Sequence, residues 1–307
     1  MHHYGSKILI AFMTIVLLIS PGCLDLIGGN TRVEGVGDVV KHERDVKGFT
    51  GVHLATVGDM YIEFGPVESI VIEAQENLHD YIDVYVKNDV LIVDTKQGYN
   101  LQSDRSLIYT VTLNALDYVR VSSSGDIHAP DITARDLAVD ISSSGDFDMG
   151  DLECSELDIR VSSSGDVLIG DIKADRINLN IGSSGTIEAQ NVTSPAFEAR
   201  VSSSGDIHIG VLLASEIYAR LSSSGDIVLK RGEAAHQDIS ISSSGNYKAS
   251  ELLADESVID ISSSGDAYIA VNNNLEAELS SSGSIYYSGN PSLSVKEHSS
   301  GRVRKAD

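Results

Sequence analysis

A hexapeptide close to V-S-S-S-G-D returns at a nearly fixed interval through most of this 307-residue chain. Successive copies lie twenty residues apart, and two looser copies follow at steps of eighteen residues. Self-similarity at such a period is typical of solenoids and other repeat architectures, which grow by adding units. The chain is therefore expected to be a stack of equivalent units. The evenly spaced glycines are Gly125, Gly145, Gly165, Gly185, Gly205, Gly225, Gly245 and Gly265.

Within one repeat, residues 121–141, apolar residues alternate with polar ones, as in Leu137, Val139 and Ile141. Such alternation indicates a strand with one buried face. The alternation changes phase after Ala129 and again after Ala134, so each repeat contains three short strands separated by corners. The unit lacks helical spacing and is half the length of a propeller blade. The sequence thus predicts an all-β fold, a single-stranded parallel β-helix of about 20-residue coils.

The S-S-S-G-D bend is first interpreted as a structural turn, with the eight glycines as its turn residues. Glycine suits a position that needs close backbone approach or a positive φ. The middle serines, Ser123, Ser143 and Ser163, have inward parity and predict a column of hydrogen-bonded hydroxyls. The acidic residue after each glycine is expected to face water or to bond the backbone of its own turn.

The aspartates of the bends suggest one metal hypothesis. Adjacent coils lie about 4.8 Å apart, so a column of carboxylates would repel and attract a cation. Each coil supplies one aspartate, however, whereas calcium takes about six to eight oxygens. No cofactor is therefore expected, and calcium is retained as a minor hypothesis for a column interrupted at Thr186 and Asn246. That column is Asp126, Asp146, Asp166, Asp206, Asp226 and Asp266.

Other chemistry-bearing residues give no site. His128 and His208 share one outward position but are four coils apart, about 19 Å, too far for one ion. Cys154 replaces the alanine of sister repeats and is expected to be a small core residue. We expect no catalytic residue, since residues 121–269 contain no insertion that would build an active site.

The N-terminus is a targeting segment. Residues 1–22 are predicted to be a lipoprotein-type signal peptide, because the twelve-residue apolar run Ile8–Ile19 is too short to span a bilayer comfortably. Cys23 would then be the lipid-attachment residue, although Ser20 stands where such signals usually carry leucine. Residues 23–31 form a tether, 32–118 a cap with irregular first coils, 119–303 the regular repeats, and 304–307 a tail. In the cap, Leu54 aligns with Val121, and a hairpin turn is expected at Asn88-Asp89.

The net charge of −23 excludes nucleic acid as a partner, because no basic surface is available for phosphates. An acidic surface instead fits an extracytoplasmic location, anchored to the cell membrane or envelope through Cys23.

From about Val33 to Val303 the chain resembles the family named putative auto-transporter adhesin, head GIN domain. The resemblance rests on "ERDVKGFTGVHLATVGDMYIEFG", "IVIEAQENLHDYIDVYVKNDVLIV", the S-G-[DN]-[IV] bends and "GSIYYSGNPSL". It implies a right-handed β-helix at the cell surface and brings no catalytic residues. The expected function is a non-catalytic, adhesin-like or structural lipoprotein module that contacts the membrane, surface glycans or envelope proteins. The alternative is a secreted polysaccharide lyase or hydrolase built on the same helix.

Overall fold

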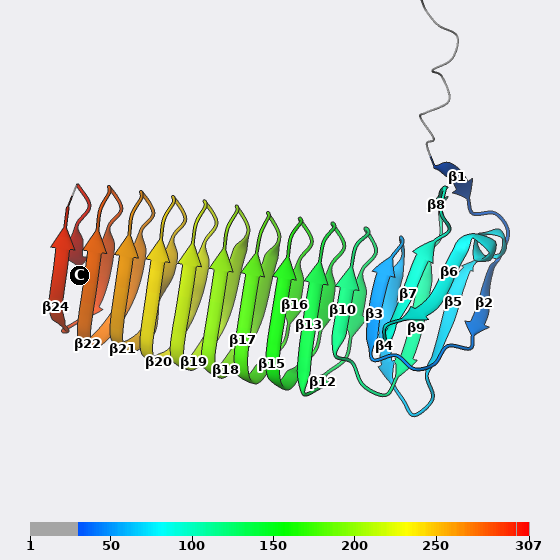
Figure 1. The fold of residues 1–307 in the computed structure, drawn as a ribbon, viewed down its shortest axis with the longest axis horizontal. Coiled ribbons are helices and arrows are strands. Elements are labelled where there is room, and N and C mark those ends of the chain that lie inside the picture. The colour runs from blue at the N-terminus through cyan, green and yellow to red at the C-terminus, as the bar shows by residue number, and fades with distance from the viewer. Residues whose placement is uncertain (1–29, 299, 307) are drawn as a thin grey trace, which may run out of the picture.

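The chain forms an elongated, right-handed parallel β-solenoid, as expected from the repeat (Figure 1). The structure is a computed structural model that describes residues 30–306 apart from residue 299. The predicted signal peptide and Cys23 lie outside the described residues. In Figure 1 the coils stack along the long axis, with the cap at one end and the S-S-S-G-D bends aligned along one edge.

The cap contains nine strands and one 3-10 helix, and the repeats begin with β10. The cap elements are β1 (Thr31–Glu34), β2 (Val39–Arg44), β3 (Gly51–Ala55), β4 (Asp59–Phe64), β5 (Ser69–Gln75), η1 (Glu76–Tyr81), β6 (Ile82–Lys87), β7 (Val90–Thr95), β8 (Tyr99–Gln102) and β9 (Ile108–Leu113). The first coils contain β10 (Tyr118–Val121), β11 (Ile127–Ala129), β12 (Ile132–Thr133), β13 (Asp136–Ile141), β14 (Phe147–Met149), β15 (Leu152–Val161), β16 (Val167–Ile169) and β17 (Ile172–Ile181). The remaining strands are β18 (Thr186–Val201), β19 (Asp206–Leu221), β20 (Ile227–Ile241), β21 (Tyr247–Ile261), β22 (Ala267–Leu279), β23 (Ile285–Gly289), β24 (Ser292–Glu297) and β25 (Val303–Lys305).

The three predicted strands of a coil are present as β11, β12 and β13. Each strand pairs in parallel with its equivalent twenty residues later, so that Val121 lies opposite Ile141 and Ile127 opposite Phe147. From β18 to β22, the ladder continues through two of the corners, and one strand covers three sides of a coil. The bend at S-S-S-G-D is the corner at which the strands always end.

The core is a set of aliphatic columns, because every inward position stacks on its equivalent in the next coil. One group of polar side chains interrupts it. Tyr247 donates a hydrogen bond of 2.9 Å to Gln237 Oε1, and Gln237 Nε2 donates one of 2.7 Å to Ser257. All three side chains are buried. Their mutual bonding removes the penalty that unpaired polar groups would impose on the core.

The cap joins the repeats in the predicted register, since Leu54 of β3 lies opposite Val121 of β10. The predicted hairpin joins β6 to β7, with positive φ at Asn88 (52°) and Asp89 (62°). Such values are typical of the type I′ turns that match strand twist. Antiparallel pairs β2–β5 and β5–β9 then cover the start of the solenoid. Covered edges protect a sheet from pairing with other chains.

The C-terminal end is less covered. Leu293 and Val295 of β24 occupy inward positions, yet their side chains are 49% and 38% exposed because no coil follows in the described residues. Lys296 and Lys305 lie on the last strands and are exposed. Charged side chains, lysine above all, are a common protection of an open edge.

Candidate functional site

The glycine of each bend is required by close backbone packing. A Cβ on Gly205 would lie 2.2 Å from the carbonyl oxygen of Gly185 in the preceding coil. None of the eight evenly spaced glycines has a positive φ, so of the two expected reasons for glycine only close approach applies here. These glycines therefore build the corner and present no side chain to a ligand.

The serines act through atoms other than those expected. The hydroxyl of the first serine donates to the preceding coil, as from Ser142 Oγ to the carbonyl oxygen of Val121 at 3.3 Å. The middle serine accepts through its backbone, because the N–H of Gly145 donates to the carbonyl oxygen of Ser123 at 3.1 Å. The bend is thus stabilised chiefly by backbone carbonyls along the stack, and the expected column of middle hydroxyls is replaced by a column of carbonyls.

The aspartate side chains do not bond the backbone of their own turn. They accept hydrogen bonds from the backbone of the following coil. The carboxylate of Asp126 accepts the N–H of Asp146 at 2.9 Å, and Asp146 accepts that of Asp166 at 2.8 Å. The same bond recurs from Asp206 and Asp266 to the following coils, so the column is a side-chain ladder that supplements the backbone ladder. Sequence reasoning missed this use, because a repeat fixes which residues stack but not which atoms meet.

A second ladder lies at the next corner. The carboxylate of Asp131 accepts the N–H of Asp151 at 2.9 Å, and that of Asp151 accepts the N–H of Asp171 at 2.8 Å. The sequence analysis did not predict this ladder, although aspartate recurs at this place every twenty residues and could have indicated it.

The carboxylates of the first ladder differ in their electrostatic surroundings. Partial burial raises the pKa of Asp146, and the neighbouring Asp126 and Asp166 carboxylates raise it further, against the lowering effect of the Asp166 N–H. Burial also acts to raise the pKa of Asp226, but hydrogen bonds from Lys248 and Asn246 outweigh it and the net shift is downward. Within the described residues, no three His, Cys, Asp or Glu side chains gather in a way that would hold a metal ion. Calcium on this ladder therefore stays a hypothesis.

His128 and Cys154 take part in no shared site among the described residues. His128 stacks on Tyr61, with ring centroids 5.0 Å apart, and its Nδ1 lies 3.3 Å from Asp148. Cys154 is half-buried against the core, where burial, followed by the charges of Asp136 and Asp175, raises its pKa to about 11. At neutral pH this thiol is protonated, as expected for a packing residue and not for a nucleophile.

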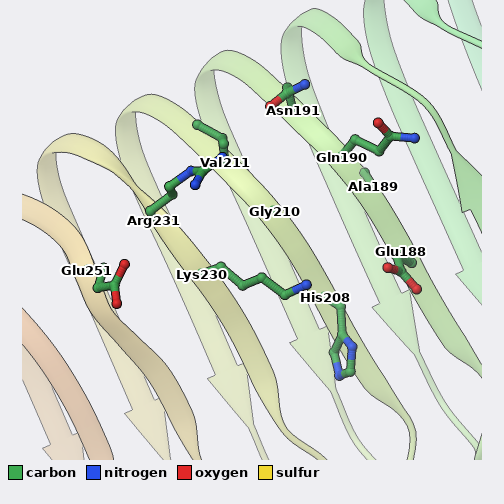
Figure 2. A pocket seen from close by; sticks show the side chains of 10 residues that line it. All are labelled: Glu188, Ala189, Gln190, Asn191, His208, Gly210, Val211, Lys230, Arg231 and Glu251. Atoms are coloured by element: carbon green, nitrogen blue, oxygen red, sulfur yellow. The ribbon is translucent and has the colours of Figure 1, made fainter.

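An open groove of about 680 Å³ lies at the corner between β18, β19, β20 and β21 (Figure 2). It exists because Gly210 has no side chain, while the neighbouring coils present Gln190 and Lys230 at the same position. In Figure 2 the side chain of Lys230 extends toward the neighbouring coil that carries Gly210 and His208. Sequence reasoning did not identify this groove. The groove is lined by Glu188, Ala189, Gln190, Asn191, His208, Gly210, Val211, Lys230, Arg231 and Glu251.

The charged residues of the groove are available to a ligand. Lys230, Arg231, Glu188 and Glu251 are exposed, and none of them forms an ion pair with another described residue. Donors and acceptors that converge on an open, polar hollow are suited to binding a hydroxyl-rich or charged molecule. The lining residues of the groove include no nucleophile with an adjacent base.

The stacked coils and this groove define a β-solenoid that carries its charged side chains on the outer surface. Residues 48–230 and 177–291 match the family described as putative auto-transporter adhesin, head GIN domain, and together they cover most of the chain. The protein belongs to this family, as its resemblance suggested.

Solved structures share the fold. A crystal structure of a putative adhesin from Parabacteroides merdae ATCC 43184 is 22% identical, covers 90% of this chain and 100% of its own, and has a TM-score of 0.51. A putative lipid binding protein from Parabacteroides distasonis ATCC 8503 is 20% identical with the same coverage and a TM-score of 0.51. Comparison with curated proteins gives no match. Among the described residues, no helix has the length and apolar character needed to cross a membrane.

Proposed function

We propose that the protein is a non-catalytic binding module of the cell surface, adhesin-like in its role and held at the membrane by a lipid on Cys23. The observation that carries the proposal is the polar groove at Gly210, whose exposed charged side chains form no ion pair with another described residue. Family membership supports the adhesin-like role. The apolar run before Cys23 supports the lipid anchor.

The groove is poorly arranged for the alternative function, hydrolysis of a polysaccharide. Its two carboxylates, Glu188 and Glu251, lie three coils apart, which is about 14 Å along the stack. Glycosidases place their two carboxyl groups about 5–9.5 Å apart. The closer aspartates of the bend ladder already accept backbone N–H groups. We therefore favour binding over cleavage.

A glycan array probed with the full chain tests the proposal. The wild type is expected to bind a subset of surface glycans. The double substitution Lys230→Gln and Arg231→Gln is expected to abolish that binding. Lys87→Gln, an exposed change in the distant β6–β7 hairpin, is the matched control and should bind normally. Release of reducing sugar from any bound glycan would establish an enzyme instead.

The anchor is tested separately by fractionation of cells that produce Cys23→Ser. This variant is expected in the medium or as an uncleaved precursor. A processed variant that still sediments with membranes would contradict attachment at Cys23.

A further inference from the structure

One coil departs from the others on the face formed by β10, β13 and the equivalent strands. Its bend begins with Gly182, whereas the other seven regular repeats have serine there. Asn180 stands between Arg160 and Arg200 in the outward column, and Thr186 replaces the aspartate of the ladder. All three changes shorten a side chain or remove a negative charge.

The fold does not require glycine at position 182. The closest atom to a Cβ there, the carbonyl oxygen of Val161, would be 3.8 Å away, which is ordinary contact. The φ of Gly182 is not positive. Glycine even forfeits the hydroxyl bond that Ser162 and Ser202 make to the preceding coils. Its consequence is a gap in the row of serine side chains.

The gap forms part of a notch of about 300 Å³ over the ends of β15, β17, β18 and β19. This volume is at the lower end of ligand pockets, about 300–1,000 Å³, and has room for a single sugar unit. No carboxylate lines it. Its lining consists of Arg160, Val161, Ser162, Asn180, Ile181, Gly182, Arg200, Val201, Ser202, Arg220 and Ser222.

Each arginine around the notch is oriented by an ion pair and still has N–H donors free for a ligand. Arg160 pairs with Asp158 at 2.5 Å, Arg200 pairs with Glu198, and Arg220 lies 3.0 Å from Asp238. The side chains of Arg160 and Arg200 remain 60% and 52% exposed. A guanidinium has five N–H donors in a planar fork, so each arginine retains donors for a second oxyanion.

We propose that the notch binds one oxyanion-bearing sugar unit, with its carboxylate on the Arg160 and Arg200 guanidinium groups and its hydroxyls on Asn180, Ser162 and Ser202. A polyanion is disfavoured, because a chain of net charge −23 repels it at long range. A sugar with a single acidic group gains the charge-assisted bonds and is repelled far less, because the repulsion scales with the charge of the ligand. The proposal rests on the proposed function, to which it adds a ligand class and a second site.

Saturation-transfer NMR with the full-length protein in detergent micelles tests the notch. Methyl glucuronide is the probe, and methyl glucoside, which differs by its lack of a carboxylate, is the reference ligand. The glucuronide is expected to bind on the order of tenfold more tightly. Gly182→Ser, which places the serine of the sister coils in the middle of the notch, should abolish the difference, as should Arg160→Gln combined with Arg200→Gln.

Arg176→Gln removes one positive charge from the coil of Gly182 at a position outside the notch, and it should bind as the wild type does. Circular dichroism confirms that each variant is folded. Equal binding of glucuronide and glucoside would overturn the proposal, as would unchanged binding by Gly182→Ser or equal weakening by Arg176→Gln. Full displacement of the glucuronide by sodium sulfate at equal concentration would show a bare anion site and also overturn it. A silent glycan array with a positive glucuronide signal would reject the adhesin-like role while retaining the notch.

Discussion

At the scale of single residues, the bend glycines and Gly182 are small for different reasons. Gly205 packs against the backbone of the preceding coil, where a Cβ would lie 2.2 Å from the Gly185 carbonyl oxygen. We expect Gly205→Ala to cost about 1–3 kcal/mol, the usual range for overpacking. Gly182→Ala, whose Cβ has no atom closer than 3.8 Å, should melt within a few degrees of the wild type. Thermal unfolding followed by circular dichroism compares the two, and equal losses would contradict the packing of the bend.

The aspartate ladder gives a second prediction at this scale. Asp146 accepts the N–H of Asp166, and its charge is opposed by Asp126 and Asp166. Asp146→Asn keeps an acceptor oxygen and removes the repulsion, so it should be at least as stable as the wild type at pH 7. The chain already uses this solution at Asn246, which accepts the N–H of Asp266 at 3.1 Å.

Asp146→Ala, in contrast, leaves that N–H without its acceptor and should lose about 1 kcal/mol. Denaturant unfolding of the two variants provides the measurement. An Asn variant as unstable as the Ala variant would show that charge, and not the hydrogen bond, is what the ladder requires.

At the scale of elements, the cap contains a histidine that links stability to pH. His79 in η1 is buried, donates through Nε2 to the carbonyl oxygens of Val40 (3.1 Å) and Ala74 (3.2 Å), and stacks on His42. Burial is the main cause that lowers the pKa of His79, with His42 and Arg44 adding to it against the two carbonyls. Folding therefore favours the neutral ring. The contribution of His79 is complete above the unfolded pKa of about 6.5 and is lost as the pH falls below it.

Hydrogen exchange of peptides that cover β2 and η1 should accordingly be faster at pH 5.5 than at pH 7.5, after correction for intrinsic exchange rates. His79→Gln retains a side-chain N–H donor and should remove much of this difference. His236→Gln, outside the cap, is the control. An unchanged pH dependence in His79→Gln would assign the effect to other groups.

The same scale shows what could be predicted from the sequence. Alternation and the twenty-residue period were sufficient for the strands, the parallel stacking and the Leu54–Val121 register, because each depends only on which residues face inward. The carboxylate ladder depends on a side-chain rotamer and a backbone N–H in another coil, which no pattern specifies. The groove at Gly210 depends on side-chain lengths across four coils. The notch was visible only as three departures, at Asn180, Gly182 and Thr186.

At the scale of the whole molecule, stability should be a sum over coils and their interfaces. Deletion of residues 206–225 brings Asp226 to the place of Asp206 and leaves every column in register, so the product should fold with a modest loss of stability. Deletion of residues 206–215 sets strands against bends and moves Ile217 out of its buried column. Circular dichroism and thermal melting should show a folded protein in the first case and an unfolded one in the second. Equal loss of structure in both would contradict the stacked-coil architecture.

The ladders between coils run along the long axis of the molecule, which gives it a particular response to mechanical load (Figure 1). Tension applied between the two ends acts on the ladders of the terminal coil first, because that coil receives the load and has a neighbouring coil on one side only. Each coil that detaches releases twenty residues, or about 70 Å of extended chain. A pulled molecule would therefore lengthen in near-equal steps, yielding coil by coil while the remaining stack keeps its shape.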